Sequence, residues 1–310
     1  MNTAAIVVAL AASALFALAA SLSARLLPPR HSTWLISVGA VASALSATVV
    51  LALVGLVLVG QLPLFAEEGQ WSTSALHDHA PTEPGVGVVS LVLLLAAAAA
   101  VLFVGCRHGL ALRAAYRACE AMSGGTGELV VLRGAPANAV AVPGRPGRVV
   151  VGESLLAALS ANERRALLAH EHAHLEHGHH WHRSAVFLAA AANPLLAPLR
   201  SAIVYTTERW ADEQAATEVG DRRHVATALA RAALVTRSPV PAFGQLAIAA
   251  QAVPDRVAAM LARPSRPRPV LTAAVLALPL LGAIAAVIVW NDTEDLFELA
   301  GRVYRAGHGR

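Results

Sequence analysis

Long apolar stretches separated by short polar ones make up much of the chain. Four of them, residues 3–27, 34–62, 86–105 and 270–290, are long enough to cross a bilayer core as helices, which takes about 20 consecutive apolar residues. The first also resembles a secretory signal, but it has no basic start and its apolar run is too long. The pattern therefore predicts an α-helical integral membrane protein with four spans.

Arginines lie on one side of the predicted spans and acidic residues on the other. Arginines follow the first and third spans and precede the fourth, whereas residues 61–85 and the stretch after the fourth span are acidic. Basic residues favour the cytoplasmic side of a membrane. We therefore predict a multi-pass protein of the cell membrane with both termini outside, an acidic outer loop (61–85), a cytoplasmic domain (106–269) and a short outer tail (291–310).

The predicted cytoplasmic domain has the pattern of an α+β fold. An arginine-bearing helix over residues 107–122 should come first. Short β-branched runs then follow at residues 129–132, 139–142 and 149–151. Punctuated by Pro143-Gly144 and Pro146-Gly147, they predict a small sheet with a hairpin. Ser160 and Glu163 fit a capping box that begins a helix. We expect a zincin-like domain whose sheet precedes this helix.

The composition agrees with a membrane protein. Of the 310 residues, 56% are hydrophobic and only 14% are charged, against about 25% charged in an ordinary soluble domain. The two cysteines, Cys106 and Cys119, are too few for a disulfide framework. The arginines flank the spans and do not form one stripe, so we expect no direct binding of nucleic acid.

The predicted helix after the sheet contains an H-E-x-x-H motif at residues 170–174. Residues four apart share a helix face, so His170 and His174 can bind one Zn²⁺. Glu171 follows the first of them and can accept the proton of a water held at such a site. We predict one Zn²⁺ per chain, with Glu171 as the general base.

A catalytic zinc site needs a third protein ligand. Glu208 and Asp212 are again four apart on one predicted helix. We predict that Glu208 binds the metal and that Asp212 hydrogen-bonds a ligating imidazole. The apolar residues 184–205 separate the two motifs, and a straight helix there would hold them about 33 Å apart. We therefore predict a membrane-associated hairpin that turns back at Asn193-Pro194.

Seven of the thirteen histidines lie between residues 170 and 182. The five that are not predicted ligands could form a weak metal-loading patch, but we favour a polar helix end that faces the lipid headgroups. These five are His172, His177, His179, His180 and His182. Among them, His179 is the one that we expect to contact a substrate or an oxyanion.

Four segments in this order resemble membrane-integrated zinc metallopeptidases of the BlaR/MecR type and, more distantly, the HtpX and CAAX prenyl proteases. They are residues 138–144, 170–174, 208–212 and 255–261. The resemblance implies a gluzincin in which His170, His174 and Glu208 hold Zn²⁺. It also implies that Arg256 braces the metal helix or the substrate. An extended substrate would add to the edge of the strand that contains Asn138, Ala139, Val140 and Ala141.

Three spans before the motif and one after it are similar to the BlaR/MecR arrangement. The resemblance implies a regulatory protease that cleaves a cytoplasmic or membrane-proximal protein, such as a BlaI-type transcriptional repressor. BlaR/MecR sensors also carry an outer penicillin-binding domain with an S-x-x-K serine. This sequence contains no lysine, and twenty residues follow Trp290, so we expect no covalent sensing of β-lactams.

Two other functions stay open at this point. An HtpX-like quality-control peptidase would use the same site, and the apolar hairpin suits cleavage of misfolded membrane segments. A zinc transporter would place its ligands inside a span. Here charged residues surround the motif, namely Glu163, Arg164, Arg165, Glu176 and Arg183. We therefore favour a zinc metalloendopeptidase with a role in signal transduction.

Overall fold

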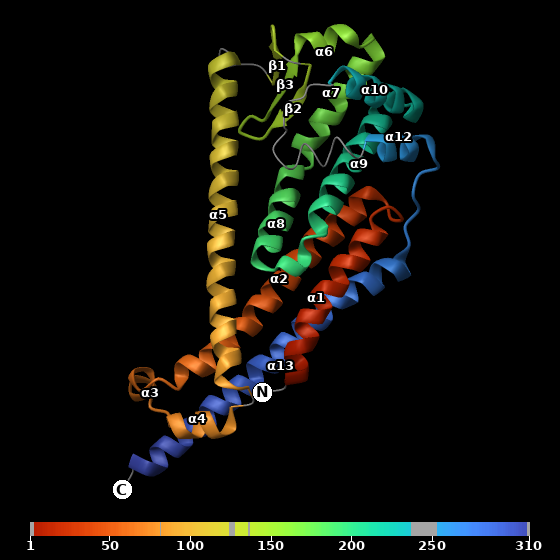
Figure 1. Cartoon of the computed structure of the whole chain (residues 1–310). Helices are drawn as coiled ribbons and strands as arrows, with labels where there is room; N and C mark the ends of the chain where they lie inside the picture. Colours follow the sequence, from red (N-terminus) through yellow and green to blue (C-terminus); the bar gives the residue numbers. More distant parts are fainter. Residues whose placement is uncertain (1–2, 81, 124–127, 136, 237–252, 309–310) are drawn as a thin grey trace.

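The computed structural model describes residues 3–80, 82–123, 128–135, 137–236 and 253–308. Long helices form an elongated bundle that carries a smaller domain with a sheet at one end (Figure 1). Among the described residues, four helices are long and apolar enough to cross a membrane: α1 (Thr3–Ser23), α2 (Pro29–Gly60), α5 (Pro84–Ser123) and α13 (Pro269–His308). The prediction of four spans is confirmed, and the protein is a multi-pass membrane protein.

Two of these helices continue well beyond the predicted spans. α5 is one helix of 40 residues: residues 107–122 are helical, as predicted, but they continue the third span without a break. Residues 106–123 include no proline and are rich in Ala, Leu and Arg, which favour helix continuation. α13 also has 40 residues and passes through the acidic stretch after Trp290. Each of these helices therefore continues without a break from an apolar span into a polar region.

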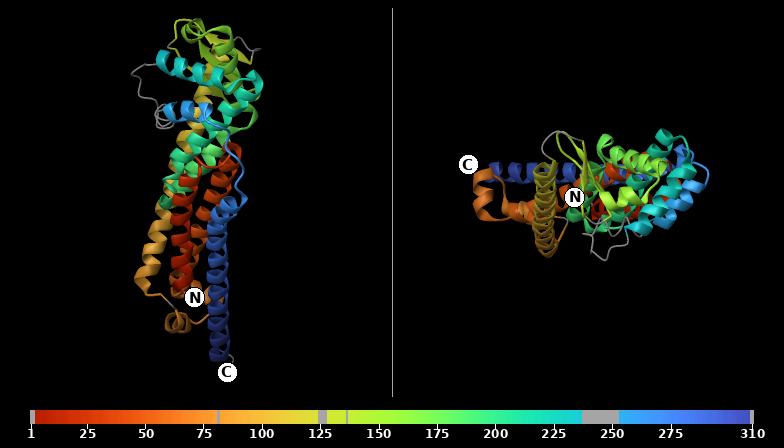
Figure 2. Two further views of the ribbon diagram at one scale, coloured as in Figure 1. Left: turned by 90° about the vertical axis from the view of Figure 1, so that its right-hand side faces the viewer. Right: turned by 90° about the horizontal axis from the view of Figure 1, so that it is seen from above.

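The loop between α2 and α5 contains two short helices, α3 (Pro63–Gly69) and α4 (Thr73–His79). Between them, Trp71 packs edge-on against Phe297 of α13, with 5.1 Å between ring centroids. The indole N–H of Trp71 donates a hydrogen bond of 2.7 Å to the carbonyl of Gly60. These contacts fix the loop on the end of the bundle opposite the sheet (Figure 2).

The three predicted strands form one sheet. β1 (Leu129–Leu132), β2 (Ala139–Val142) and β3 (Arg148–Gly152) lie in the order β1-β3-β2, with β3 parallel to β1 and antiparallel to β2. β3 is fully buried, which suits its three consecutive valines. The predicted hairpin of β2 and β3 is confirmed, and it leaves β2 as an edge strand.

The helices of the domain follow the sheet in the chain. α6 (Glu153–Ala158) leads to α7 (Ala161–Glu176), which begins at the predicted capping box: Ser160 Oγ accepts from the Glu163 N–H, and Glu163 Oε2 accepts from the Ser160 N–H. The remaining helices are α8 (His179–Ala192), η1 (Pro194–Leu196), α9 (Leu199–Val219), α10 (Arg222–Val235) and α12 (Val253–Leu261).

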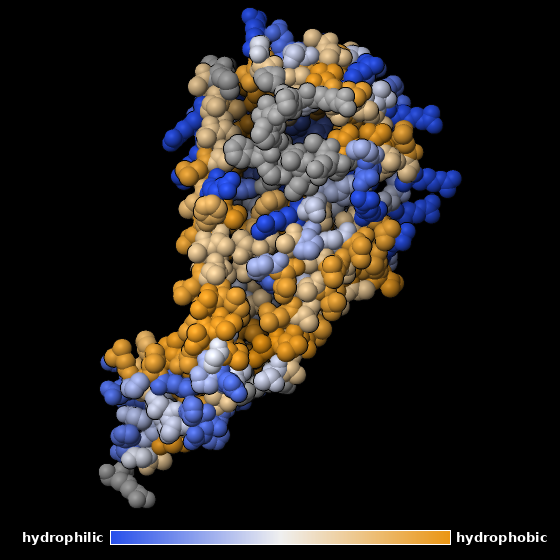
Figure 3. All heavy atoms as spheres, viewed as in Figure 1, coloured by the Kyte–Doolittle hydropathy of each residue, from blue (hydrophilic) through white to orange (hydrophobic). Residues whose placement is uncertain are grey.

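The apolar stretch between the two motifs turns back at Asn193-Pro194, as predicted. Asn193 Oδ1 accepts a hydrogen bond from the Leu195 N–H, and η1 joins α8 to α9. The resulting hairpin packs on α1 and α2 through a buried apolar cluster that includes Phe16, Ile36, Val186 and Ile203. Figure 3 shows an apolar belt across this half of the molecule, between two more polar ends. The hairpin thereby brings α7 and α9 side by side.

Candidate metal centre

α7 and α9 bring the three predicted zinc ligands together. The Nε2 atoms of His170 and His174 are 3.2 Å apart, and Glu208 lies 3.5 Å from His170 Nε2 through Oε2 and 3.6 Å from His174 Nε2 through Oε1. Tetrahedral ligand atoms at about 2.0–2.1 Å from zinc are separated by about 3.3 Å. The spacing and the donor types therefore fit a single Zn²⁺.

Asp212 lies one helical turn after Glu208 and faces the first histidine. His170 Nδ1 donates a hydrogen bond of 3.0 Å to Asp212 Oδ1, and only 1% of the surface of Asp212 is exposed. A carboxylate at this position fixes the tautomer and the orientation of an imidazole whose other nitrogen faces a metal. Asp212 thus makes the contact that its predicted orienting role requires, and the role itself stays a prediction.

Arg256 of α12 contacts the carboxylates of Glu208 and Asp212 on α9. Its Nε and Nη2 donate to the two oxygens of Asp212 at 2.9 and 2.7 Å, and its Nη1 lies 2.7 Å from Glu208 Oε2. Arg256 is buried, and a two-pronged guanidinium fixes a carboxylate in direction as well as distance. The side chain thus braces α9, whereas the resemblance implied a contact with the helix of the H-E-x-x-H motif or with the substrate.

Two of the additional histidines, His179 and His182, are buried and a third, His177, is partly buried, which corrects the expectation that these residues face lipid headgroups. His179 has 1% of its surface exposed, and its Nδ1 lies 2.8 Å from Nδ1 of His174. His177 stacks on Trp210 with 4.7 Å between ring centroids. His182 is also buried and bonds to Ser37 Oγ of α2 at 2.9 Å. The aromatic surface of Trp210 gives these rings an interior position that the sequence pattern does not reveal.

Arg183 is part of the site and was not among the predicted site residues. Its Nη2 lies 2.7 Å from Glu208 Oε1, and its Nε donates to Thr207 Oγ1 at 2.8 Å. The sequence holds a signal for it, because Arg183 is the only Asp, Glu, Lys or Arg residue between Glu176 and Arg200. A lone charge in an apolar segment needs a buried partner, and Glu208 is that partner.

The pKa values of the four central titratable groups of the site are shifted in different directions. Burial raises the pKa of Glu171, which is 8% exposed, and the nearby Glu208 carboxylate raises it further. Burial also disfavours the charged form of Glu208. Arg256 and the other cationic neighbours of Glu208 outweigh this effect and hold the pKa of Glu208 well below the usual range. For His170, the effects of Asp212 and Glu208 exceed that of burial and raise the pKa to about 9. Burial lowers the pKa of His174.

A cavity of about 160 Å³ lies beside His170 and Glu171. Asn138 and Ala139 line it, together with apolar side chains of α6, α7 and α10. Because the Gly152 N–H donates to the Asn138 carbonyl, the alternation of antiparallel pairing directs the backbone groups of Ala139 and Ala141 away from β3. The backbone N–H of Ala141 accordingly interacts with the Glu171 carboxyl. The free edge of β2 therefore faces the metal centre.

Paired helices with this ligand cluster, next to a strand edge, define a zinc-dependent hydrolase. The family model for peptidase family M48 matches residues 108–263, about half of the chain, and this range contains the whole metal centre. The chain therefore belongs to peptidase family M48 and is a zinc metalloendopeptidase. No curated protein and no solved structure matches it.

Proposed function

We propose that this chain is a membrane-embedded endopeptidase that cleaves a cytoplasmic or membrane-proximal protein. In this proposal His170, His174 and Glu208 hold Zn²⁺, and Glu171 is the general base. The observation that carries it is the position of Glu171, which follows the first histidine of the cluster and interacts with the free edge of β2 through the Ala141 N–H. A base at this position lies between the metal centre and the strand that would align a peptide.

The residues of the chain divide the chemistry among them. When bound, Zn²⁺ supplies a Lewis acid that polarises the scissile carbonyl and acidifies water. Glu171 accepts the proton of the attacking water and passes it to the leaving amine, a role that its raised pKa favours. Asp212 and His179 orient the two imidazoles through their second nitrogens. Arg183 and Arg256 keep Glu208 ionised and in place.

The substrate would bind as an added strand on β2. Ala139 and Ala141 are two residues apart, the period with which an extended peptide presents its own hydrogen-bonding groups. The cavity beside them is lined by Leu155, Leu167, Val225 and Leu229, so it suits one apolar side chain of the substrate. Asn138 and Val140 complete the predicted binding segment. Because this segment would pair with the peptide backbone, it requires no particular side chain in the substrate.

The central test compares Glu171→Gln with the wild type. We expect about one zinc per chain in both purified proteins. Loss of the base should reduce cleavage of a denatured protein such as casein by about 10²-fold or more. Glu176→Gln, a change of the same type at the end of α7, is the control and should retain activity. Full activity of the Glu171→Gln protein would exclude Glu171 as the base.

The proposal also concerns whether the peptidase has a regulatory role. The resemblance to BlaR/MecR-type proteins supports a single target, with a BlaI-type repressor as the candidate, whereas the apolar hairpin beside the site supports quality control in the manner of HtpX. New protein N-termini in cells that express the wild type, but not the Glu171→Gln variant, distinguish the two. One dominant cleavage product supports regulation, and many membrane-protein fragments support quality control.

A further inference from the structure

A second cavity, of about 400 Å³, lies away from the metal centre. Its volume falls in the range of small-molecule sites. It forms between the residues that follow α1 and the linker that joins α12 to α13. Its lining consists of four arginines and three other residues: Arg25, Leu26, Arg263, Pro264, Ser265, Arg266 and Arg268.

Most of the positive charge in this cavity is not neutralised by the protein. Arg25 pairs with Asp255 of α12 at 2.6 Å. Within the described part of the chain, no ion pair is found for Arg263, Arg266 or Arg268, all of which are exposed. The sequence of residues 237–252 contains no Asp or Glu that could serve as a partner. Three guanidinium groups are therefore available to an external anion.

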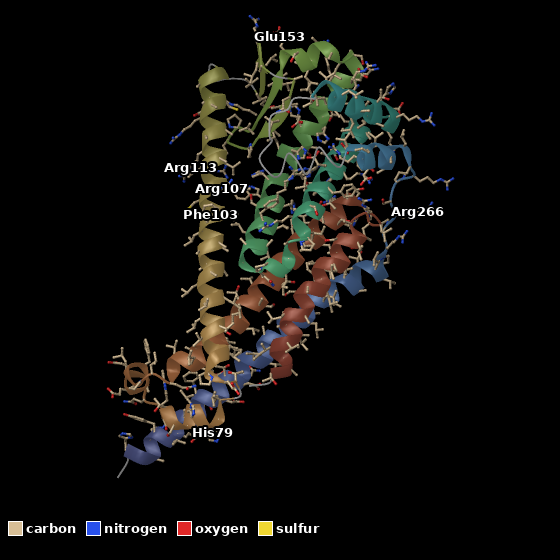
Figure 4. All side chains as sticks on the ribbon, in the orientation of Figure 1. His79, Phe103, Arg107, Arg113, Glu153 and Arg266 are labelled. Carbon is tan, nitrogen blue, oxygen red and sulfur yellow. The ribbon has the colours of Figure 1, made fainter. Side chains whose placement is uncertain are left out.

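The cavity lies at the edge of the apolar belt. Val270, in the first turn of α13, has 83% of its surface exposed, and Leu26 in the cavity wall has 45% exposed. Figure 4 shows Arg266 projecting from the linker at the end of the spans nearer the sheet, the end toward which Arg107 and Arg113 of α5 also lie. Charged and apolar surfaces thus meet at one site, which is the arrangement that an amphiphile requires.

We propose that this arginine cavity binds the phosphate of an anionic phospholipid, with the acyl chains along Leu26 and Val270. Guanidinium groups match phosphate oxygens in geometry and charge, and basic pockets beside spans are suited to anionic headgroups. The adjoining apolar surface favours a lipid over free phosphate, which would leave Leu26 and Val270 in contact with water.

Such a lipid would also connect the membrane to the metal centre. α12 ends two residues before Arg263 and carries both Asp255, the partner of Arg25, and Arg256, which holds Asp212 and Glu208. A headgroup on the linker would therefore fix the position of α12 relative to α1. The binding itself does not depend on the proposed peptidase activity.

Native mass spectrometry of the full chain in detergent micelles tests the proposal, with phosphatidylglycerol and phosphatidylcholine as probes. We expect the wild type to bind one phosphatidylglycerol at least tenfold more tightly than phosphatidylcholine. The triple variant Arg263→Gln, Arg266→Gln, Arg268→Gln should lose this preference. The matched control Arg107→Gln, Arg113→Gln, Arg117→Gln removes three exposed arginines from α5 and should stay within twofold of the wild type.

Further measurements exclude simpler explanations. An equal loss of binding in both triple variants would show general electrostatic attraction and overturn the proposal. Displacement of the lipid by an equal concentration of inorganic phosphate would show a site for free anions and overturn the lipid assignment. Leu26→Gln with Val270→Gln should weaken phosphatidylglycerol binding while all four arginines remain. Unchanged lipid affinity in this double variant would contradict the role of the apolar wall.

Discussion

At the residue scale, each proposed zinc ligand is held by a second side chain. Asp212 bonds to His170, His179 contacts His174, and Glu208 lies between two arginines, Arg183 and Arg256. The motif and the E-x-x-x-D pair could be predicted because helical spacing alone places those residues on one face. Arg183 and His179 could not be placed in the same way, since their contacts depend on how α8 packs against α7 and α9.

Removal of the charge of Asp212 should weaken metal binding. In the Asp212→Asn variant, His170 loses its carboxylate partner and Arg256 loses one of its two anions, so we expect zinc affinity to fall by about 10–100-fold. Competition with a chromophoric chelator measures this affinity. Glu218→Gln alters an exposed carboxylate on the same helix and should leave it unchanged. An unaltered zinc affinity in Asp212→Asn would contradict the orienting role.

The capping residue Glu163 should make stability depend on pH. Its hydrogen bond from the Ser160 backbone lowers its pKa, and Arg231 lowers it further. A carboxyl group whose pKa is lower in the folded state stabilises the fold above its unfolded pKa, and this contribution is lost as the pH falls through the folded value. Glu163→Ala removes the acceptor for the Ser160 N–H and should therefore destabilise the fold by on the order of 1 kcal/mol at pH 7. In thermal unfolding, the difference from wild type should shrink as the pH falls below the usual pKa of a glutamate, and a constant difference would contradict the role of Glu163.

At the element scale, α8 connects the membrane bundle to the metal centre. Its start lies against α7 through His179, its next turn reaches α2 through His182, and Arg183 reaches Glu208 on α9. The strands, the capping box and the turn at Asn193 were predictable because their signals are local. The lengths of α5 and α13 were not, because hydropathy marks where a lipid-facing segment ends and not where the helix ends.

The contact between α2 and α8 should contribute measurably to stability. Ser37 Oγ bonds to His182 Nδ1 in a buried position, so Ser37→Ala leaves a buried imidazole nitrogen without its partner. We expect a loss of about 1–3 kcal/mol, seen as a lower melting temperature in detergent. Ser201→Ala removes an exposed hydroxyl that bonds only within its own helical turn and serves as the control. Equal melting temperatures for the two variants would rule out this contribution.

At the scale of the whole molecule, the long helices cross the predicted domain boundaries. α5 passes through the boundary at residues 105–106 and α13 through the one at 290–291, so the metal domain is joined to the spans by continuous helix. The division of the chain, its orientation and the entry of residues 184–205 into the bilayer stay predictions. Figure 4 shows that His79 and Glu153 lie at opposite ends of the molecule.

Cysteine labelling tests the predicted orientation. On a background of Cys106→Ser and Cys119→Ser, His79→Cys should react with a membrane-impermeant maleimide in intact cells, because the acidic loop is predicted to lie outside. Glu153→Cys, in the metal domain, should react only after permeabilisation. Both positions are exposed, so burial does not limit either reaction. Labelling of Glu153→Cys in intact cells would contradict the predicted orientation and indicate the opposite one.

X-ray absorption spectroscopy at the zinc edge of the purified wild-type protein tests the metal centre itself. We expect about one zinc per chain, with two imidazole nitrogens and further oxygen ligands at about 2.0–2.1 Å. The signal should be lost in Glu208→Ala and His174→Ala. A zinc site with sulfur at about 2.3 Å, which would require Cys106 or Cys119, or a spectrum unchanged in both variants, would contradict the assignment of His170, His174 and Glu208 as the metal site.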